Sequence, residues 1–122
     1  MHGSVKICDI LEQKFTISLE VIPPRNGASF ESIKKNILLL ASESPDFISV
    51  TKGAGGSLRG GSLPIAHYIQ NHLMIPALAH FTCRDYSIQE VENSLIDHHY
   101  FGINNILALR GDPPAGLGSE YI

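Results

Sequence analysis

The sequence predicts an α/β fold, because short apolar runs of strand length alternate with stretches of helical periodicity. Four such runs are rich in Ile, Val, Leu, Phe or Ala, as expected for strands buried on both faces of a parallel sheet. They are residues 15–22, 46–51, 75–79 and 105–109. The resulting order is βαβαβαβ, and alternation of this kind is typical of a parallel sheet covered by helices.

Two helices are expected between the first three strands. The first begins near residue 30 and carries charged residues on the side opposite its apolar face. The second runs from about residue 63 to residue 73 and repeats an apolar residue every four positions. The apolar positions of the two helices are Phe30, Ile33, Ile37, Leu38, Leu40, Ile65, Ile69 and Leu73.

A third helix is expected over residues 88–101. Its inward face is expected to carry Val91, Leu95 and Ile96. Ser87 precedes it and Glu90 follows three residues later, which is the spacing of a capping box. Gly102 then provides a C-terminal stop before the fourth strand.

Composition narrows the class of protein. The 122 residues suit one domain, and with 43% hydrophobic and 17% charged residues the chain is expected to fold. The formal net charge is -3 and the basic residues are scattered, which argues against nucleic-acid binding. No apolar run suggests a membrane span, and the N-terminus does not resemble a secretory signal. With Cys8 and Cys83 interpreted as reduced thiols, we expect a cytoplasmic protein.

The order of elements leaves two architectures open: an open, doubly wound sheet and the first half of a closed barrel. Both architectures place their functional sites at the carboxyl ends of the strands. The residues at the four strand ends are therefore the candidates for function.

Glu20 lies near the end of the first strand, among Leu19, Val21 and Ile22. A carboxylate in such surroundings is costly unless it is paired, hydrogen-bonded or protonated. Burial raises the pKa of a carboxyl group, and a carboxyl group that keeps its proton near neutral pH can act as a general acid. The alternative is a glutamate at a strand end that reaches solvent or a basic neighbour.

The other three strand ends are also polar. Thr51 ends the second strand and leads into the small residues 53–57, which favour either a ligand cradle or a flexible loop. His80 comes directly after the third strand. Its spacing from Cys83 can suit a metal, but no second pair of ligands is present, and a hydrogen-bonding role in a pocket wall is favoured. Residues 109–112 end the fourth strand and can direct a guanidinium and a carboxylate toward a ligand.

Together, these segments resemble the methylenetetrahydrofolate reductase family. The matching stretches, in the family's order and with about its spacing, are Ser18–Arg25, Ser49–Ser57, Ala79–Cys83 and Ala108–Pro114. The resemblance spans roughly residues 15 to 116 and implies a (β/α)8 barrel of the TIM type. Residues 15–122 would form its N-terminal half, about four βα units, behind an extension of residues 1–14.

The resemblance implies FAD bound at the carboxyl ends of the strands. It also implies reduction of 5,10-methylenetetrahydrofolate to 5-methyltetrahydrofolate with NADH or NADPH, in one-carbon and methionine metabolism. Glu20 matches the general acid that assists opening of the folate imidazolidine ring, and Asp112 matches a carboxylate near flavin and pterin. The positions that match the flavin site are Thr51, His80, Leu109, Arg110, Gly111 and Asp112. Lys52 departs from the family, which often has an aromatic residue there.

Length raises further alternatives, since barrels of this type usually need about 250 residues. We expect the chain to be a fragment that is not competent alone, completed by a C-terminal half or by homo-oligomer formation. A non-catalytic half-barrel subunit, or pseudoenzyme, that assembles with a partner chain is the second hypothesis. The third is a lyase or hydrolase that uses Glu20, His80 and Asp112 with a divalent metal.

Overall fold

Helices and strands alternate along the part of the chain that the structure describes. The computed structural model describes residues 5–24, 29–52, 60–84 and 86–110. In chain order the elements are α1 (Ile7–Gln13), β1 (Ser18–Val21), α2 (Phe30–Ala41), β2 (Phe47–Val50), α3 (Ser62–Asn71), β3 (Ala77–Thr82), α4 (Ile88–Tyr100) and β4 (Ile106–Leu109).

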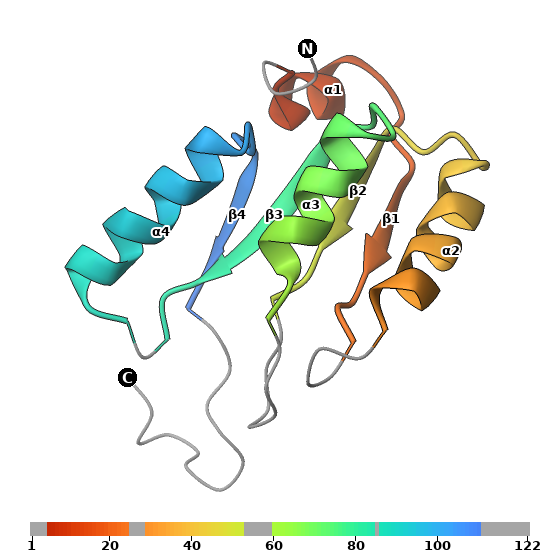
Figure 1. Ribbon diagram of the computed structural model, residues 1–122. Helices are drawn as coiled ribbons and strands as arrows, with labels where there is room; N and C mark the ends of the chain where they lie inside the picture. Colours follow the sequence, from red (N-terminus) through yellow and green to blue (C-terminus); the bar gives the residue numbers. More distant parts are fainter. Residues whose placement is uncertain (1–4, 25–28, 53–59, 85, 111–122) are drawn as a thin grey trace, which may run out of the picture.

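The four strands form one parallel sheet in the order β1-β2-β3-β4. Connections between neighbouring parallel strands are almost always right-handed, so strands that follow one another in this order place every connecting helix on the same face. Figure 1 shows α2, α3 and α4 on one face of the sheet. A doubly wound sheet would reverse its strand order and carry helices on both faces. The observed topology is therefore that of a partial (β/α)8 barrel.

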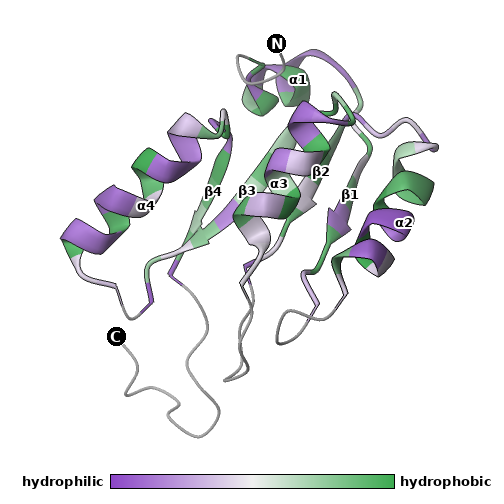
Figure 2. Ribbon diagram, in the orientation of Figure 1, coloured by the Kyte–Doolittle hydropathy of each residue, from purple (hydrophilic) through white to green (hydrophobic). Residues whose placement is uncertain are grey.

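The hydrophobic core lies between the sheet and its helices. Side chains from β1, β2 and β3 pack there against side chains from α2 and α3. Figure 2 shows hydrophobic residues concentrated in the strands. The fully or almost fully buried members are Val21, Ile37, Ile48, Val50, Ile65, Ala66, Ile69, Ala77, Ala79 and Ile103. Burial of this apolar surface is the main favourable term in folding. It also fixes which strand residues point to the opposite face.

Helix α4 has the predicted bounds within one residue and the predicted capping box. The Ser87 Oγ accepts a hydrogen bond from the Glu90 backbone N–H, and the Glu90 side chain accepts one from the Ser87 N–H. Gly102 follows α4 with a φ of 77°, a conformation that favours glycine. The predicted inward face was wrong in part, because His98 is buried whereas half of Ile96 is exposed.

The short helix α1 was not predicted. It lies across the amino ends of the strands, opposite the edge where the strands end (Figure 1). The side chain of Asn105, just before β4, accepts a hydrogen bond from the Ile7 N–H and donates one to the Val5 carbonyl. Ile7, the first residue of α1, is the buried residue of this helix. No helix in the described ranges combines the length and the apolar character needed to cross a membrane.

Strand β3 continues three residues beyond the predicted end at Ala79. The additional residues pair with β4, since His80 lies opposite Leu107 and Thr82 lies opposite Leu109. The polar character of His80 and Thr82 concealed this continuation in the sequence. His80 is therefore a residue within a strand, with its side chain held at a fixed place on the sheet.

Candidate functional site at the carboxyl ends of the strands

The sheet face opposite the helices carries the polar residues of the candidate site. Side chains alternate between the two faces of a strand, so residues that flank the core positions point to the opposite face. Val21, Val50 and Ala79 belong to the core. Glu20, Ser49 and His80, each next to one of them, therefore share the face that no described helix covers.

Glu20, Ser49 and His80 form a connected group across three strands. Glu20 and Ser49 lie opposite each other in the β1–β2 register. The Ser49 hydroxyl donates a hydrogen bond of 3.3 Å to the Glu20 Oε1. The same oxygen lies 3.6 Å from the His80 Nε2, which makes the contact an ion pair when the imidazole is protonated. A carboxyl group and an imidazole are the side chains most often used in general acid–base catalysis, and here they face each other beside the end of the sheet.

The sequence-based expectation of a buried Glu20 was wrong. Its side chain is 53% exposed, whereas that of His80 is only 14% exposed. Apolar neighbours in the sequence did not bury the carboxylate, because Val21 points into the core and Glu20 points to the uncovered face. The alternative that a strand-end glutamate reaches solvent and a basic neighbour describes the observed surroundings.

The remaining predicted site residues follow the strand ends. The Thr51 N–H donates to the Val21 carbonyl, which continues the β1–β2 pairing one residue beyond β2. Leu109 ends β4 and Arg110 follows it, and both are exposed. Gly111 and Asp112 lie outside the described residues, as does the glycine-rich segment 53–57.

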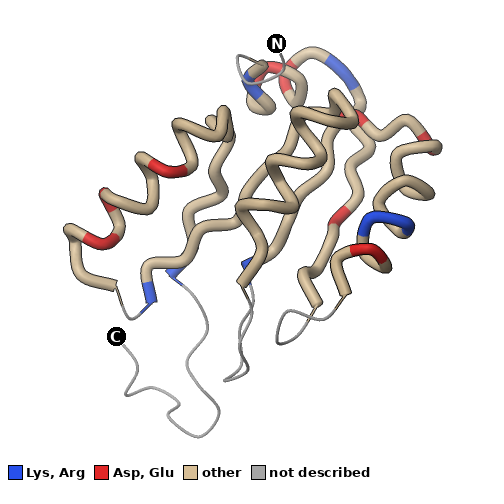
Figure 3. The backbone as a smooth tube through the Cα atoms, viewed as in Figure 1, with Lys and Arg blue, Asp and Glu red and all other residues tan. Residues whose placement is uncertain are grey.

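Basic residues follow three successive strands at the carboxyl edge. Lys52 comes two residues after β2, Arg84 two residues after β3, and Arg110 directly after β4. Figure 3 shows these positive charges together at this edge of the sheet. Clustered cations suit an anionic ligand, because guanidinium and ammonium groups form strong hydrogen bonds with phosphate oxygens.

Sequence reasoning overlooked two parts of this site. Ser49 gave no signal, because a single serine in an apolar strand is indistinguishable from a packed residue until the register with Glu20 is known. The second part is a contact of Lys52. Its ammonium donates to the Tyr86 hydroxyl and lies over the rings of Phe81 and Tyr86.

The described residues contain no cluster of three His, Cys, Asp or Glu side chains that could hold a metal ion. Cys8 and Cys83 are both free and exposed. His98 and His99 point away from each other on α4, since His98 is buried and His99 is exposed.

The fold and site define the class: a β/α-barrel protein whose polar and basic residues gather at the carboxyl ends of its strands. A family model described as methylenetetrahydrofolate reductase matches residues 6–120. The chain belongs to this family.

Curated relatives agree with the family model. The chain is 38% identical over 112 residues to "Methylenetetrahydrofolate reductase (NADH) 1" of Arabidopsis thaliana, covering 91% of this chain and 19% of the relative. It is 34% identical over 122 residues to "Methylenetetrahydrofolate reductase 2" of Schizosaccharomyces pombe, covering 96% and 19%. It is 33% identical over 108 residues to "5,10-methylenetetrahydrofolate reductase" of Escherichia coli, covering 88% and 36%. The chain thus spans only a minor part of each relative's length.

Proposed function

We propose that this chain provides the first four βα units of a flavin-dependent reductase. The reaction is reduction of 5,10-methylenetetrahydrofolate to 5-methyltetrahydrofolate by NADH or NADPH, in the cytoplasm. Membership of the family supports the reaction, and the Arabidopsis and Escherichia coli relatives are both named as methylenetetrahydrofolate reductases. Because the chain corresponds to 19% to 36% of those relatives, the activity belongs to a protein in which further strands complete the barrel.

The residues present fit FAD at the carboxyl edge. Arg110, with Arg84 nearby on the same edge, supplies positive charge for a pyrophosphate. Thr51 and His80 supply polar groups near the ends of β2 and β3, and Leu109 supplies an apolar surface. By resemblance, Gly111 and Asp112 complete this group of flavin-contacting residues. FAD, when bound and reduced, supplies the hydride that reduces the methylene carbon of the folate.

Glu20 is the general acid of the proposed reaction. Its carboxyl group donates a proton to the folate nitrogen that leaves as the imidazolidine ring opens, which makes the methylene carbon electrophilic. Ser49 and His80 both contact Oε1 of Glu20, and Oε2 is the oxygen that can present the proton to the substrate. This three-residue group is the observation on which the proposal of general-acid catalysis depends. By resemblance, Asp112 orients the folate.

The test is a comparison of the two half-reactions in the full-length protein. Glu20→Gln should bind FAD and accept electrons from NADH or NADPH as the unaltered protein does. Its reduction of methylenetetrahydrofolate should fall by about 10²–10⁴-fold, the usual contribution of a general acid. Stopped-flow absorbance of the flavin follows each half-reaction separately.

Ser49→Ala is the matched control, because it removes the hydrogen bond to Oε1 and leaves the carboxyl group in place. Its folate half-reaction should fall far less than that of Glu20→Gln. An undiminished folate half-reaction in Glu20→Gln would show that the proton comes from another group.

A further inference from the structure

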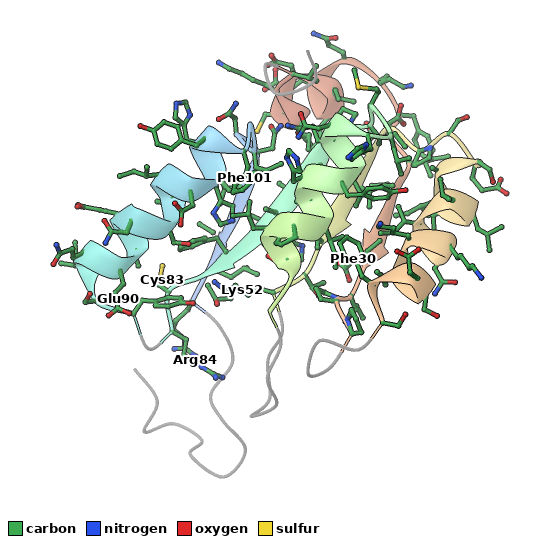
Figure 4. The ribbon with its side chains drawn as sticks, in the orientation of Figure 1. Phe30, Lys52, Cys83, Arg84, Glu90 and Phe101 are labelled. Atoms are coloured by element: carbon green, nitrogen blue, oxygen red, sulfur yellow. The ribbon has the colours of Figure 1, made fainter. Side chains whose placement is uncertain are left out.

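Lys52 makes contacts that join the ends of two strands. Its Nζ donates a hydrogen bond of 3.2 Å to the Tyr86 hydroxyl. The same nitrogen lies 5.0 Å from the centroid of the Phe81 ring and 4.8 Å from that of the Tyr86 ring. Lys52 follows β2, Phe81 belongs to β3, and Tyr86 lies in the connection from β3 to α4. Figure 4 shows Lys52 and Arg84 at this carboxyl edge.

The contact lies where the pairing between β2 and β3 ends. The last residue pair of that ladder is Val50 with Ala79. Strand β3 continues to Thr82, but there its ladder partner is β4, and the Cys83 N–H donates to the Leu109 carbonyl. Beyond Val50, Lys52 therefore provides a cross-connection between β2 and the segment that follows Ala79.

The environment of Lys52 holds its ammonium in place. Phe81 is 2% exposed, and its ring packs edge-on against His98 of α4, with ring centroids 5.6 Å apart. An ammonium over aromatic rings is attracted by their negative faces. Among the described residues, no carboxylate lies within ion-pair distance of Lys52 to draw it away from these rings. The connection thus extends from the end of β2 through a buried ring to α4.

The turn after β3 is the part that Lys52 restrains. The Tyr86 N–H donates to the Cys83 carbonyl, which closes the turn that contains Arg84. Thr51, next to Lys52, and His80, next to Phe81, are the polar residues on the opposite face. A contact that fixes Lys52 against Phe81 and Tyr86 therefore also fixes Thr51 against His80.

We propose that Lys52 is a positioning residue of the candidate site, which clamps Phe81 and Tyr86 to the end of β2. The clamp keeps Thr51 and His80 at a constant separation and keeps Arg84 at the carboxyl edge. This inference rests on the proposed function for its consequence, namely tight flavin binding, but the clamp itself is independent of it. Lys52→Met keeps a long apolar side chain and removes the positive charge and the donor.

The clamp is tested by proteolysis with an arginine-specific protease, in the full-length protein without ligand. Mass spectrometry then measures the rate of cleavage after Arg84. Lys52→Met should raise this rate about fivefold, as expected when a cation–π contact and its hydrogen bond are lost from a local structure. Lys52→Arg, which can restore both interactions, should return the rate close to that of the unaltered protein.

Lys34→Met is the matched control. The Lys34 Nζ lies 4.8 Å from the Phe30 ring centroid and 5.6 Å from that of Tyr68, so the variant loses the same kind of interaction. Lys34 and its two aromatic partners belong to α2 and α3 and do not join strand ends. Cleavage after Arg84 should be unchanged in this variant. An unchanged rate in Lys52→Met, or an equal increase in both variants, would overturn the clamp.

The consequence of the clamp for the candidate site is tested by titrating the protein with FAD and measuring flavin fluorescence. Lys52→Met should weaken FAD binding about fivefold, and Lys52→Arg should restore it. Faster cleavage in Lys52→Met with unchanged FAD affinity would overturn the role in positioning the site. If the unaltered protein shows no saturable FAD binding, both the proposed function and that role fail, whereas the cleavage rates still decide whether the clamp exists.

Discussion

Asp46 shows how one half-buried residue fixes the spacing of two strands. Its Oδ1 accepts a 2.7 Å hydrogen bond from the Lys14 ammonium, and its Oδ2 accepts one of 2.9 Å from the Ile17 N–H. The Asp46 N–H donates in turn to the Ile17 carbonyl. These bonds tie the approach to β1 to the residue before β2. The hydrogen bond from Lys14, followed by that from Ile17, lowers the pKa of Asp46 below its ordinary value of 3.8.

A pH dependence of stability follows from this lowered pKa. A carboxyl group with a lower pKa in the folded state stabilises the protein above its unfolded pKa, and the effect is lost as pH falls through the folded pKa. Asp46→Asn should therefore unfold at lower urea concentration than the unaltered protein at neutral pH. The difference should shrink as pH falls below 3.8.

Glu43→Gln is the control for Asp46→Asn, because it removes the same charge from an exposed position at the end of α2. Its unfolding midpoint should lie close to that of the unaltered protein at every pH. A gap between Asp46→Asn and the unaltered protein that stays constant through the acid range would contradict the assignment to the Asp46 carboxylate.

At the scale of a single element, α4 depends on its N-terminal cap. Most of its residues are exposed and few pack on the core, so local interactions carry a larger share of its stability than in α3. Ser87→Ala removes the hydroxyl that accepts from the Glu90 N–H. The free energy of unfolding should fall by about 1 kcal/mol, within the range for loss of an N-cap. Urea denaturation followed by far-UV circular dichroism measures it.

Ser87→Asp is the matched control, because an aspartate also accepts at the N-cap and its charge suits the helix N-terminus. Its stability should equal or exceed that of the unaltered protein. Equal destabilisation by alanine and by aspartate would mean that the Ser87 side chain acts through a contact other than the cap.

The elements that sequence predicted well are those governed by local chemistry. Apolar spacing located α2 and α3, and the Ser87–Glu90 pair fixed the start of α4. The prediction failed where pairing between distant residues decides the outcome. β3 continues through His80 because β4 lies beside it, and α1 is held by Asn105, about a hundred positions along the chain.

The candidate site follows the same division. That function lies at the strand ends could be predicted from the order of elements, because parallel strands bring their carboxyl ends to one edge. The group of Glu20, Ser49 and His80 depends on the register between strands. That register could not be predicted from the sequence. Residues adjacent in sequence, such as Leu19 and Val21, indicated burial of Glu20, whereas strand alternation exposes it.

At the scale of the whole molecule, the uncovered sheet face connects the fold with the function. Leu107 and Leu109 point to this face and remain 39% and 41% exposed. The ladder also leaves β1 and β4 as edges among the described strands. Exposed apolar surface beside unpaired strand edges favours association with other strands. In a complete barrel, further strands would cover these surfaces and enclose Glu20.

The last prediction concerns the polypeptide of residues 1–122 when it is produced alone. It should self-associate, because pairing of its edges and burial of the uncovered face both lower the free energy. Leu107→Lys places a charge on that face and should raise the dissociation constant about tenfold. Ile96→Lys, at a position 50% exposed on α4, is the matched control and should leave association unchanged. Sedimentation velocity over a range of concentrations measures both. An unchanged dissociation constant in Leu107→Lys, or an equal increase in both variants, would show that the uncovered face has no specific role in assembly.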